Sequence, residues 1–140
     1  LMIRRPPRST LDRSSAASDV YKRQEPKEPQ NYIWFKARSS FPDNVSLHQC
    51  VLAYMSDMTL LDTCTNPHGV NFMNPNLHSA SLDHAMWFHR PFKADEWLLY
   101  HQDSPSASGA RGFNRGSIFD LDGNLIASVA QEGLIRFTKN

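Results

Sequence analysis

Three polar side chains stand where an ordinary core would place something else: Asp57, Ser81 and Gln131. Asp57 lies late in a segment with helical periodicity, on the shoulder of its apolar stripe. A carboxylate there opposes the helix dipole by about 0.3–1 kcal/mol, so an active-site residue and a solvated helix-end residue both fit. Gln131 interrupts an apolar row within residues 125–137, which has the two-residue period of a strand. A buried amide without partners costs about 1–3 kcal/mol, so Gln131 predicts a hydrogen-bonding network or a cavity.

Ser81 is notable only for its position at the start of a stretch rich in aromatic residues. Residues 81–100 hold two tryptophans, two phenylalanines and two histidines, and Arg90-Pro91 interrupts them. This pattern predicts a strand, a turn and a second strand, with rings that line either a pocket or the core. No G-x-S-x-G motif marks a serine nucleophile anywhere in the chain. Asp83, two residues later, is an alternative to Ser81 at this position.

Metal, cofactor and phosphate sites are not indicated by the spacing of the remaining candidates. His84 and His89 are five residues apart, so on a strand they point to opposite faces. The other four histidines show no zinc-ligand spacing. Asp120 and Asp122 precede Gly123 in a hairpin turn, and the further ligands of a calcium loop are absent. The glycines of residues 109–116 are not followed by a helix, as a phosphate loop would require.

One helix and about five strands would have to position these residues. β-Forming residues predict a first strand over 32–38. A helix follows from Asn44, with an apolar stripe predicted to face the core at Leu47, Cys50, Val51, Tyr54, Met55 and Met58. After a turn-rich connection over 66–76, strands are predicted around 84–89, 97–102, 112–119 and 125–137. The order predicts an α+β fold, with the helix covering one face of an antiparallel sheet.

Composition and charge describe one domain and a separate N-terminal segment. The 140 residues are 40% apolar and carry a formal charge of +1, enough for one modest core. Residues 1–24 hold six Lys or Arg and two Asp, a balance of +4, and the remaining nine basic and twelve acidic residues leave −3. A mildly acidic domain argues against a nucleic-acid surface. Neither a membrane span nor an apolar signal segment is present in the sequence, and we expect a cytoplasmic protein without membrane partners.

Residues 1–24 are expected to form a disordered arm, because Arg, Pro and Ser are mixed there without an apolar period. The run resembles translated adaptor or vector sequence, which would make it non-native and the protein truncated; a basic targeting segment is the alternative. Residues 25–30 then form a linker and 31–140 the folded domain. Cys50 and Cys64 do not form a CxxC pair, which favours a reducing compartment. The ending lacks the Ser-Lys-Leu signal expected of a peroxisomal protein.

Four motifs in order closely resemble acyl-CoA thioesterase II of the TesB type: SASLDHAMWFHRPF at 79–92, EWLLY at 96–100, SASGARG at 106–112 and AQEGLIR at 130–136. The likeness runs from about residue 31 to 137. That family has a double hotdog fold, in which two repeats each wrap a sheet around a long helix. The chain resembles the C-terminal repeat only. The resemblance implies a missing N-terminal repeat and a homo-oligomer when the protein is complete.

The resemblance also implies roles for the three polar residues. In that family an Asp, a Ser or Thr and a Gln hold and activate the water that hydrolyses a fatty acyl-CoA thioester. Asp57 in YMSD, Ser81 in ASLDH and Gln131 in AQEG match these positions, whereas Asp83 does not. No cofactor or metal is implied. Around Trp87 and Phe88 the apolar face is a candidate to shape the acyl pocket, with packing inside the sheet as the alternative.

Two other functions remain open at this stage. Without its first repeat, the chain would be an inactive acyl-CoA-binding or oligomerisation module. A hotdog enoyl-CoA hydratase is suggested by the run NPNLH at 74–78. That motif, however, requires an Asp just upstream of Asn-Pro and Leu-His directly after it. Position 72 is Phe and Asn76 intervenes here, so thioester hydrolysis is the preferred interpretation.

Overall fold

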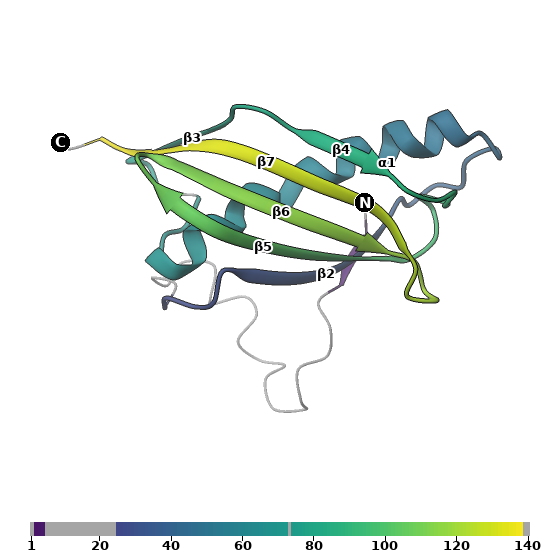
Figure 1. The fold of residues 1–140 in the computed structure, drawn as a ribbon, viewed down its shortest axis with the longest axis horizontal. Coiled ribbons are helices and arrows are strands. Elements are labelled where there is room, and N and C mark those ends of the chain that lie inside the picture. Colours follow the sequence, from purple (N-terminus) through teal and green to yellow (C-terminus); the bar gives the residue numbers. More distant parts are fainter. Residues whose placement is uncertain (1, 5–24, 73, 139–140) are drawn as a thin grey trace.

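A computed structural model describes residues 2–4, 25–72 and 74–138 of the chain (Figure 1). Most of the segment 1–24, expected to be a disordered arm, lies outside these residues. Its residues 2–4 form a short strand. The elements in order are β1 (Met2–Arg4), β2 (Gln30–Lys36), α1 (Val45–Leu60), the 3-10 helix η1 (Leu61–His68), β3 (Leu77–Ser81), β4 (Ala85–Phe88), β5 (Leu98–Ser108), β6 (Arg111–Phe119) and β7 (Leu125–Phe137).

The strands form one antiparallel sheet in the order β1-β2-β5-β6-β7-β3, and β4 also pairs with β7. The five predicted strands are confirmed as β2, β4, β5, β6 and β7. Two further strands, β1 and β3, were not predicted. Because β3 and β4 pair with successive parts of β7, Ser81 lies opposite Gly133 and Ala85 lies opposite Ala130. Figure 1 shows α1 running along one face of the curled sheet, so the α+β prediction is confirmed.

Helix α1 begins where predicted, because the Asn44 side chain caps it by accepting a hydrogen bond from Leu47 N at 3.1 Å. The predicted core stripe is only half right, however, because Met55 is buried and Val51 packs against the core but three of the six residues are exposed. The helix also buries His48, Leu52, Ser56 and Leu60, which the stripe did not include, while the predicted Cys50, Tyr54 and Met58 are exposed. His48 and Ser56 can be buried because Ala94 N donates to His48 Nδ1 and the Ser56 hydroxyl donates to Ala53 O.

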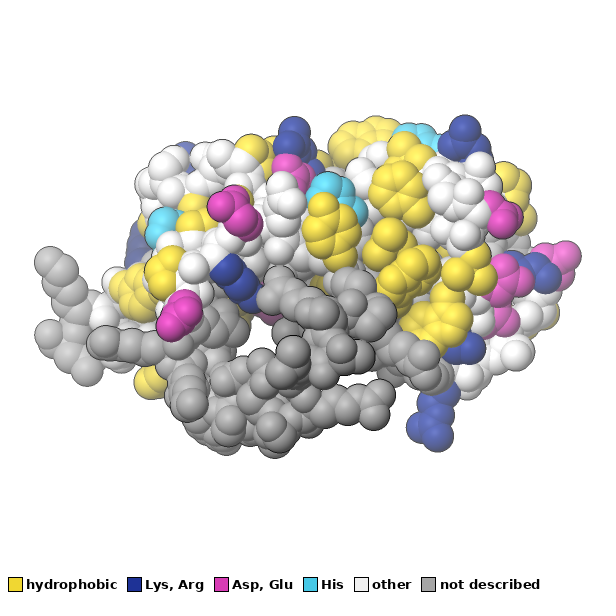
Figure 2. All heavy atoms as spheres, turned by 90° about the horizontal axis from the view of Figure 1, so that it is seen from below, with side chains coloured by type: hydrophobic (Ala, Val, Ile, Leu, Met, Phe, Trp, Pro, Cys, Tyr) yellow, Lys and Arg dark blue, Asp and Glu magenta, His cyan; other side chains and the backbone are white. Residues whose placement is uncertain are grey.

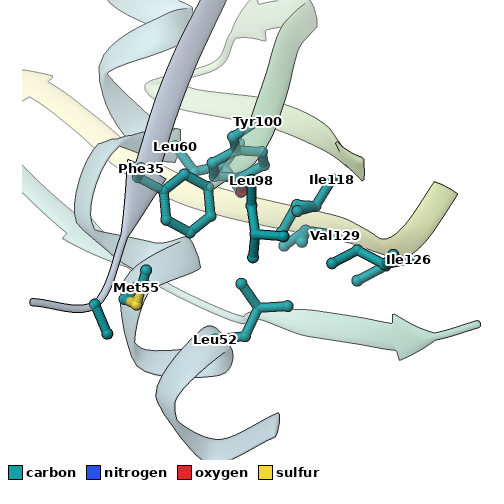
Figure 3. Close-up of a cluster of buried hydrophobic side chains, with 11 residues drawn as sticks. Phe35, Leu52, Met55, Leu60, Leu98, Tyr100, Ile118, Ile126 and Val129 are labelled. Carbon is teal, nitrogen blue, oxygen red and sulfur yellow. The ribbon is translucent and has the colours of Figure 1, made fainter. Parts of the chain in front are cut away.

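The core fills the space between α1 and the sheet. Its largest members are drawn in Figure 3: Phe35, Leu52, Met55, Leu60, Leu98, Tyr100, Ile118, Ile126 and Val129. The Tyr100 ring packs directly over Gly116, where an added Cβ would lie 2.2 Å from its Cε2. Any side chain at position 116 would therefore displace this ring.

The surface seen from the β2 side carries hydrophobic side chains toward one end and charges of both signs elsewhere (Figure 2). Among the described residues visible on this face in Figure 2, the Lys and Arg side chains are scattered and form no continuous basic stripe of the kind that phosphate backbones require. None of the helices in the described part of the chain is long and apolar enough to cross a membrane.

Candidate active site

The three candidate residues come from different elements. Asp57 lies in the last turn of α1 and is 53% exposed at its side chain. Ser81 is the last residue of β3 and is exposed. Gln131 lies in the middle of β7 and is completely buried. The alternate residues of β7 that share a face with Gln131 are buried from Ala127 to Gly133, as the alternation predicts.

These three side chains meet at one oxygen, Asp57 Oδ1. Gln131 Nε2 donates to it at 2.7 Å, and the Ser81 hydroxyl donates to it at 3.3 Å. Gln131 Nε2 also donates to Ser81 Oγ at 2.5 Å. Turning the amide around would put its oxygen against a carboxylate, so the contacts themselves fix its orientation. The carboxylate, hydroxyl and amide form a closed triangle of hydrogen bonds.

Strand register explains how residues so far apart in sequence come together. Ser81 pairs with Gly133, and Gln131 is two residues before Gly133, hence on the same face of β7. Gly133 brings this face close to the start of η1, since a Cβ there would lie 2.2 Å from Leu61 Cδ1. The sequence separations in the triangle are 24, 50 and 74 residues. The site therefore exists only when the helix and both strands are assembled.

The helix end around Asp57 is fixed from the core side by Tyr100. Its phenol donates to Ser56 O at 3.1 Å. Burial, assisted by the negative charge of Asp57, raises the pKa of Tyr100 well above its usual range. The phenol therefore stays protonated and remains a hydrogen-bond donor to the helix at all physiological pH values.

Asn114 is a site neighbour that the sequence analysis missed. It pairs with Gln131 across β6 and β7, and it is completely buried. The side-chain oxygens of both residues are buried without a hydrogen-bond partner among the described residues. The signal was available, because Asn114 interrupts the inward row of β6 in the same way as Gln131 interrupts that of β7.

His84 is the second neighbour that the analysis did not connect to the site. Its Nδ1 lies 3.8 Å from Asp57 Oδ1, and its Nε2 lies 2.9 Å from Ser56 Oγ. It occupies the short loop between β3 and β4 rather than a strand. Asp83, the alternative to Ser81, is engaged elsewhere, since its Oδ1 accepts from Glu132 N at 2.7 Å.

The aromatic residues next to the site are largely exposed: Trp87 by 53% and Phe88 by 37%. A pocket of about 220 Å³ is lined by Phe88 together with Val45, Gln49 and residues 89–92. Because Asp57, Ser81 and Gln131 do not line it, this pocket is separate from the triangle. Within the described residues, no three His, Cys, Asp or Glu side chains are grouped to hold a metal ion.

A long helix held by a curled antiparallel sheet (Figure 1) is the arrangement of a hotdog-fold domain. A family model described as acyl-CoA thioesterase matches residues 9–134, and the chain belongs to this family. The expected relation to the acyl-CoA thioesterase II family is confirmed.

Relatives and solved structures agree with this assignment. Acyl-CoA thioesterase 2 of Haemophilus influenzae is 43% identical over 110 residues, which are 79% of this chain and 38% of that protein. Acyl-coenzyme A thioesterase 8 of the mouse is 46% identical over 114 residues, 78% of this chain and 34% of that protein. The structure of acyl-CoA thioesterase II TesB2 from Mycobacterium marinum, 44% identical, superposes with a TM-score of 0.76 over 99% of this chain and 49% of that chain. This chain thus spans less than half the length of these relatives, and its hotdog fold matches one half of that structure.

Proposed function

We propose that Asp57, Ser81 and Gln131 activate water for the hydrolysis of fatty acyl-CoA thioesters, and that this chain supplies one repeat of a double-hotdog enzyme. The observation that carries the proposal is the convergence of Ser81 and Gln131 on a single oxygen of Asp57. Family membership supports the substrate class, since the relatives are named acyl-CoA thioesterases.

Each residue has a distinct role in this proposal. Gln131 and Ser81 occupy Asp57 Oδ1, so we assign the water to Oδ2. Oδ2 accepts a proton from the water as the water oxygen bonds to the thioester carbon. The resulting tetrahedral intermediate then breaks its C–S bond, the thiolate of CoA leaves, and the proton on Asp57 passes to it. The products are a free fatty acid and CoA, and no covalent acyl-enzyme forms.

Charge and exposure at the triangle are suited to this role. A carboxylate that is half exposed keeps water within reach, whereas a buried Gln131 cannot move away from it. The two donated hydrogen bonds fix the carboxylate plane, which limits the directions from which a water can be held. The carboxylate then acts from a preorganised position rather than as a mobile surface group.

A direct test compares the release of CoA thiol by the 140-residue chain and by a longer form that supplies a first repeat. Turnover is expected in the longer form and not in the chain alone. In the longer form, Asp57→Asn should reduce kcat by at least about 10²-fold, as expected for loss of a general base. Asp83→Asn is the matched control, because an amide oxygen can still accept from Glu132 N. Activity of Asp57→Asn equal to that of Asp83→Asn would refute the assignment.

The competing functions give different results in the same assay. Binding of a non-hydrolysable acyl-CoA analogue by the longer form, without thiol release from acyl-CoA, would indicate an acyl-CoA-binding module. Hydration of crotonyl-CoA without thiol release would indicate a hydratase. Either outcome would replace thioester hydrolysis as the function of this domain.

A further inference from the structure

His84 is fixed beside the triangle by a contact with the helix. Its Nε2 lies 2.9 Å from the hydroxyl of Ser56, the residue before Asp57. Ser56 is completely buried, so the ring is attached to a rigid point. The other ring nitrogen, Nδ1, faces Asp57 Oδ1 at 3.8 Å and is buried without a hydrogen-bond partner in the described part of the chain.

The single hydrogen of the Ser56 hydroxyl restricts which ring nitrogens carry protons. If this hydrogen goes to Ala53 O, which is 2.8 Å away, Nε2 must donate to Ser56 Oγ. If it goes to Nε2 instead, the ring proton lies on Nδ1. In a neutral ring with a bare Nδ1, this buried nitrogen would have no donor and its lone pair would face the Asp57 carboxylate, which is costly. The two remaining states, the imidazolium and the Nδ1–H tautomer, both direct an N–H toward Asp57.

We propose that His84 is a positioning residue for Asp57, with a protonated Nδ1 directed at Oδ1. The inference rests on the proposed function, because it assigns His84 to the same catalytic carboxylate. Ser81 and Gln131 hydrogen-bond Oδ1. The N–H of His84, at 3.8 Å too far for a hydrogen bond, adds an electrostatic attraction that favours the same carboxylate orientation, with Oδ2 toward the water. His84 acts through Asp57 and needs no contact with the substrate.

No other charged group competes for this place among the described residues. Asp57 is the only carboxylate there within ion-pair distance of the His84 ring. Asp83, its neighbour in sequence, accepts from Glu132 N. The buried Tyr100 on β5 donates its phenol to the backbone of Ser56, away from the ring. Met86 on β4 brings only its sulfur, 3.9 Å from Ser56 Oγ. The pairing of His84 with Asp57 is therefore specific.

Two amide variants separate this role from simple packing. In His84→Asn the side-chain amide takes about the place of Nδ1 and can still donate toward Asp57. In His84→Gln it takes about the place of Nε2 and can reach only Ser56. We expect kcat of the longer form to fall about tenfold in His84→Gln and to stay within about threefold in His84→Asn, with KM unchanged in both.

His78→Asn on exposed β3 is the matched control, because residue 78 points to the opposite face of the strand from Ser81 and should leave kcat unchanged. Equal loss in both His84 variants, or better activity in His84→Gln, would overturn the proposal. Absence of thiol release from the wild-type longer form would instead refute the proposed function.

A second measurement decides the positioning role without any activity. The ¹⁵N chemical shifts of the His84 ring at pH 7 report which nitrogens carry protons. In the 140-residue chain we expect Nδ1 to be protonated. In Asp57→Ala this proton should be lost from Nδ1, leaving the Nε2–H tautomer bonded to Ser56. A bare Nδ1 in the wild-type chain, or a proton that stays on Nδ1 in Asp57→Ala, would overturn the proposal.

Discussion

Gly133→Ala is expected to destabilise the chain because the new Cβ would clash with the Leu61 side chain, and shortening Leu61 to alanine removes this clash. The new Cβ would lie 2.2 Å from Leu61 Cδ1, 2.9 Å from its Cδ2 and 3.1 Å from its Cγ. All three atoms belong to one side chain, which is 8% exposed and has little room to turn. Leu61→Ala deletes every one of them.

The magnitude follows from two opposing effects of Gly133→Ala. Overpacking a core position costs about 1–3 kcal/mol. Alanine is favoured over glycine inside a strand by about 0.5–1 kcal/mol, which offsets part of this cost. In the wild-type background the substitution should therefore lower the free energy of unfolding by about 0–2.5 kcal/mol. In the Leu61→Ala background only the favourable effect remains, and Gly133→Ala should stabilise by about 0.5–1 kcal/mol.

Urea unfolding of the four proteins, followed by circular dichroism and tryptophan fluorescence, measures this cycle. Leu61→Ala alone should cost about 2–5 kcal/mol, so mild conditions or a stabilising osmolyte are needed for its background. The sign of the Gly133→Ala effect should reverse between the two backgrounds. If Gly133→Ala destabilises both backgrounds equally, the close approach of Leu61 is not what requires glycine at position 133.

Three further predictions concern stability. Asn44→Ala should lower the free energy of unfolding by about 0.5–2 kcal/mol, because Leu47 N loses its cap; unchanged urea unfolding would contradict the cap. Tyr100→Phe should cost about 0.5–1.5 kcal/mol through its lost bond to Ser56 O, with thermal unfolding as the measure and an unchanged Tm as the contrary result. A hydrogen bond from the backbone N–H of Phe41 lowers the pKa of Asp95 in the folded chain. The contribution of this bond to stability is therefore complete above the unfolded-state pKa of about 3.9 and is lost as pH falls through the lower folded-state pKa. Asp95→Asn should accordingly be less stable than wild type at pH 7 and approach it toward pH 3, and a pH-independent difference would rule this out.

Periodicity predicted the strands better than the side of the helix that is buried. Alternation placed Gln131 inward because a strand has only two faces. A helix can turn to any angle, and α1 is apolar on more than one side. Burial of His48 and Ser56 depends on Ala94 N and on the carbonyl of Ala53, partners that periodicity does not include. The predicted stripe was consequently centred to one side of the buried face, so it shares Met55 with that face but includes the exposed Tyr54 and Met58.

The sequence named the members of the candidate site, whose catalytic role stays a prediction, but not their geometry. The resemblance named Asp57, Ser81 and Gln131, and the structure brings all three together. Neither the shared oxygen nor the approach of His84 could be read from the sequence. Both depend on the register of β3 with β7 and on the path of the loop after Ser81. No local sequence pattern specifies either of these.

The triangle is complete only while β3, an edge strand of the sheet, stays paired with β7. Strand β3 has five residues, of which four are exposed, and it pairs only with β7 at the sheet edge. Such edges open locally at a small fraction of the free energy of global unfolding. During an opening Ser81 would leave while Asp57 and Gln131 stay in contact. Under the proposed function, the fraction of molecules of the longer form that are ready to react would then follow amide exchange in β3, and weakening that strand would lower kcat in a protein that remains folded.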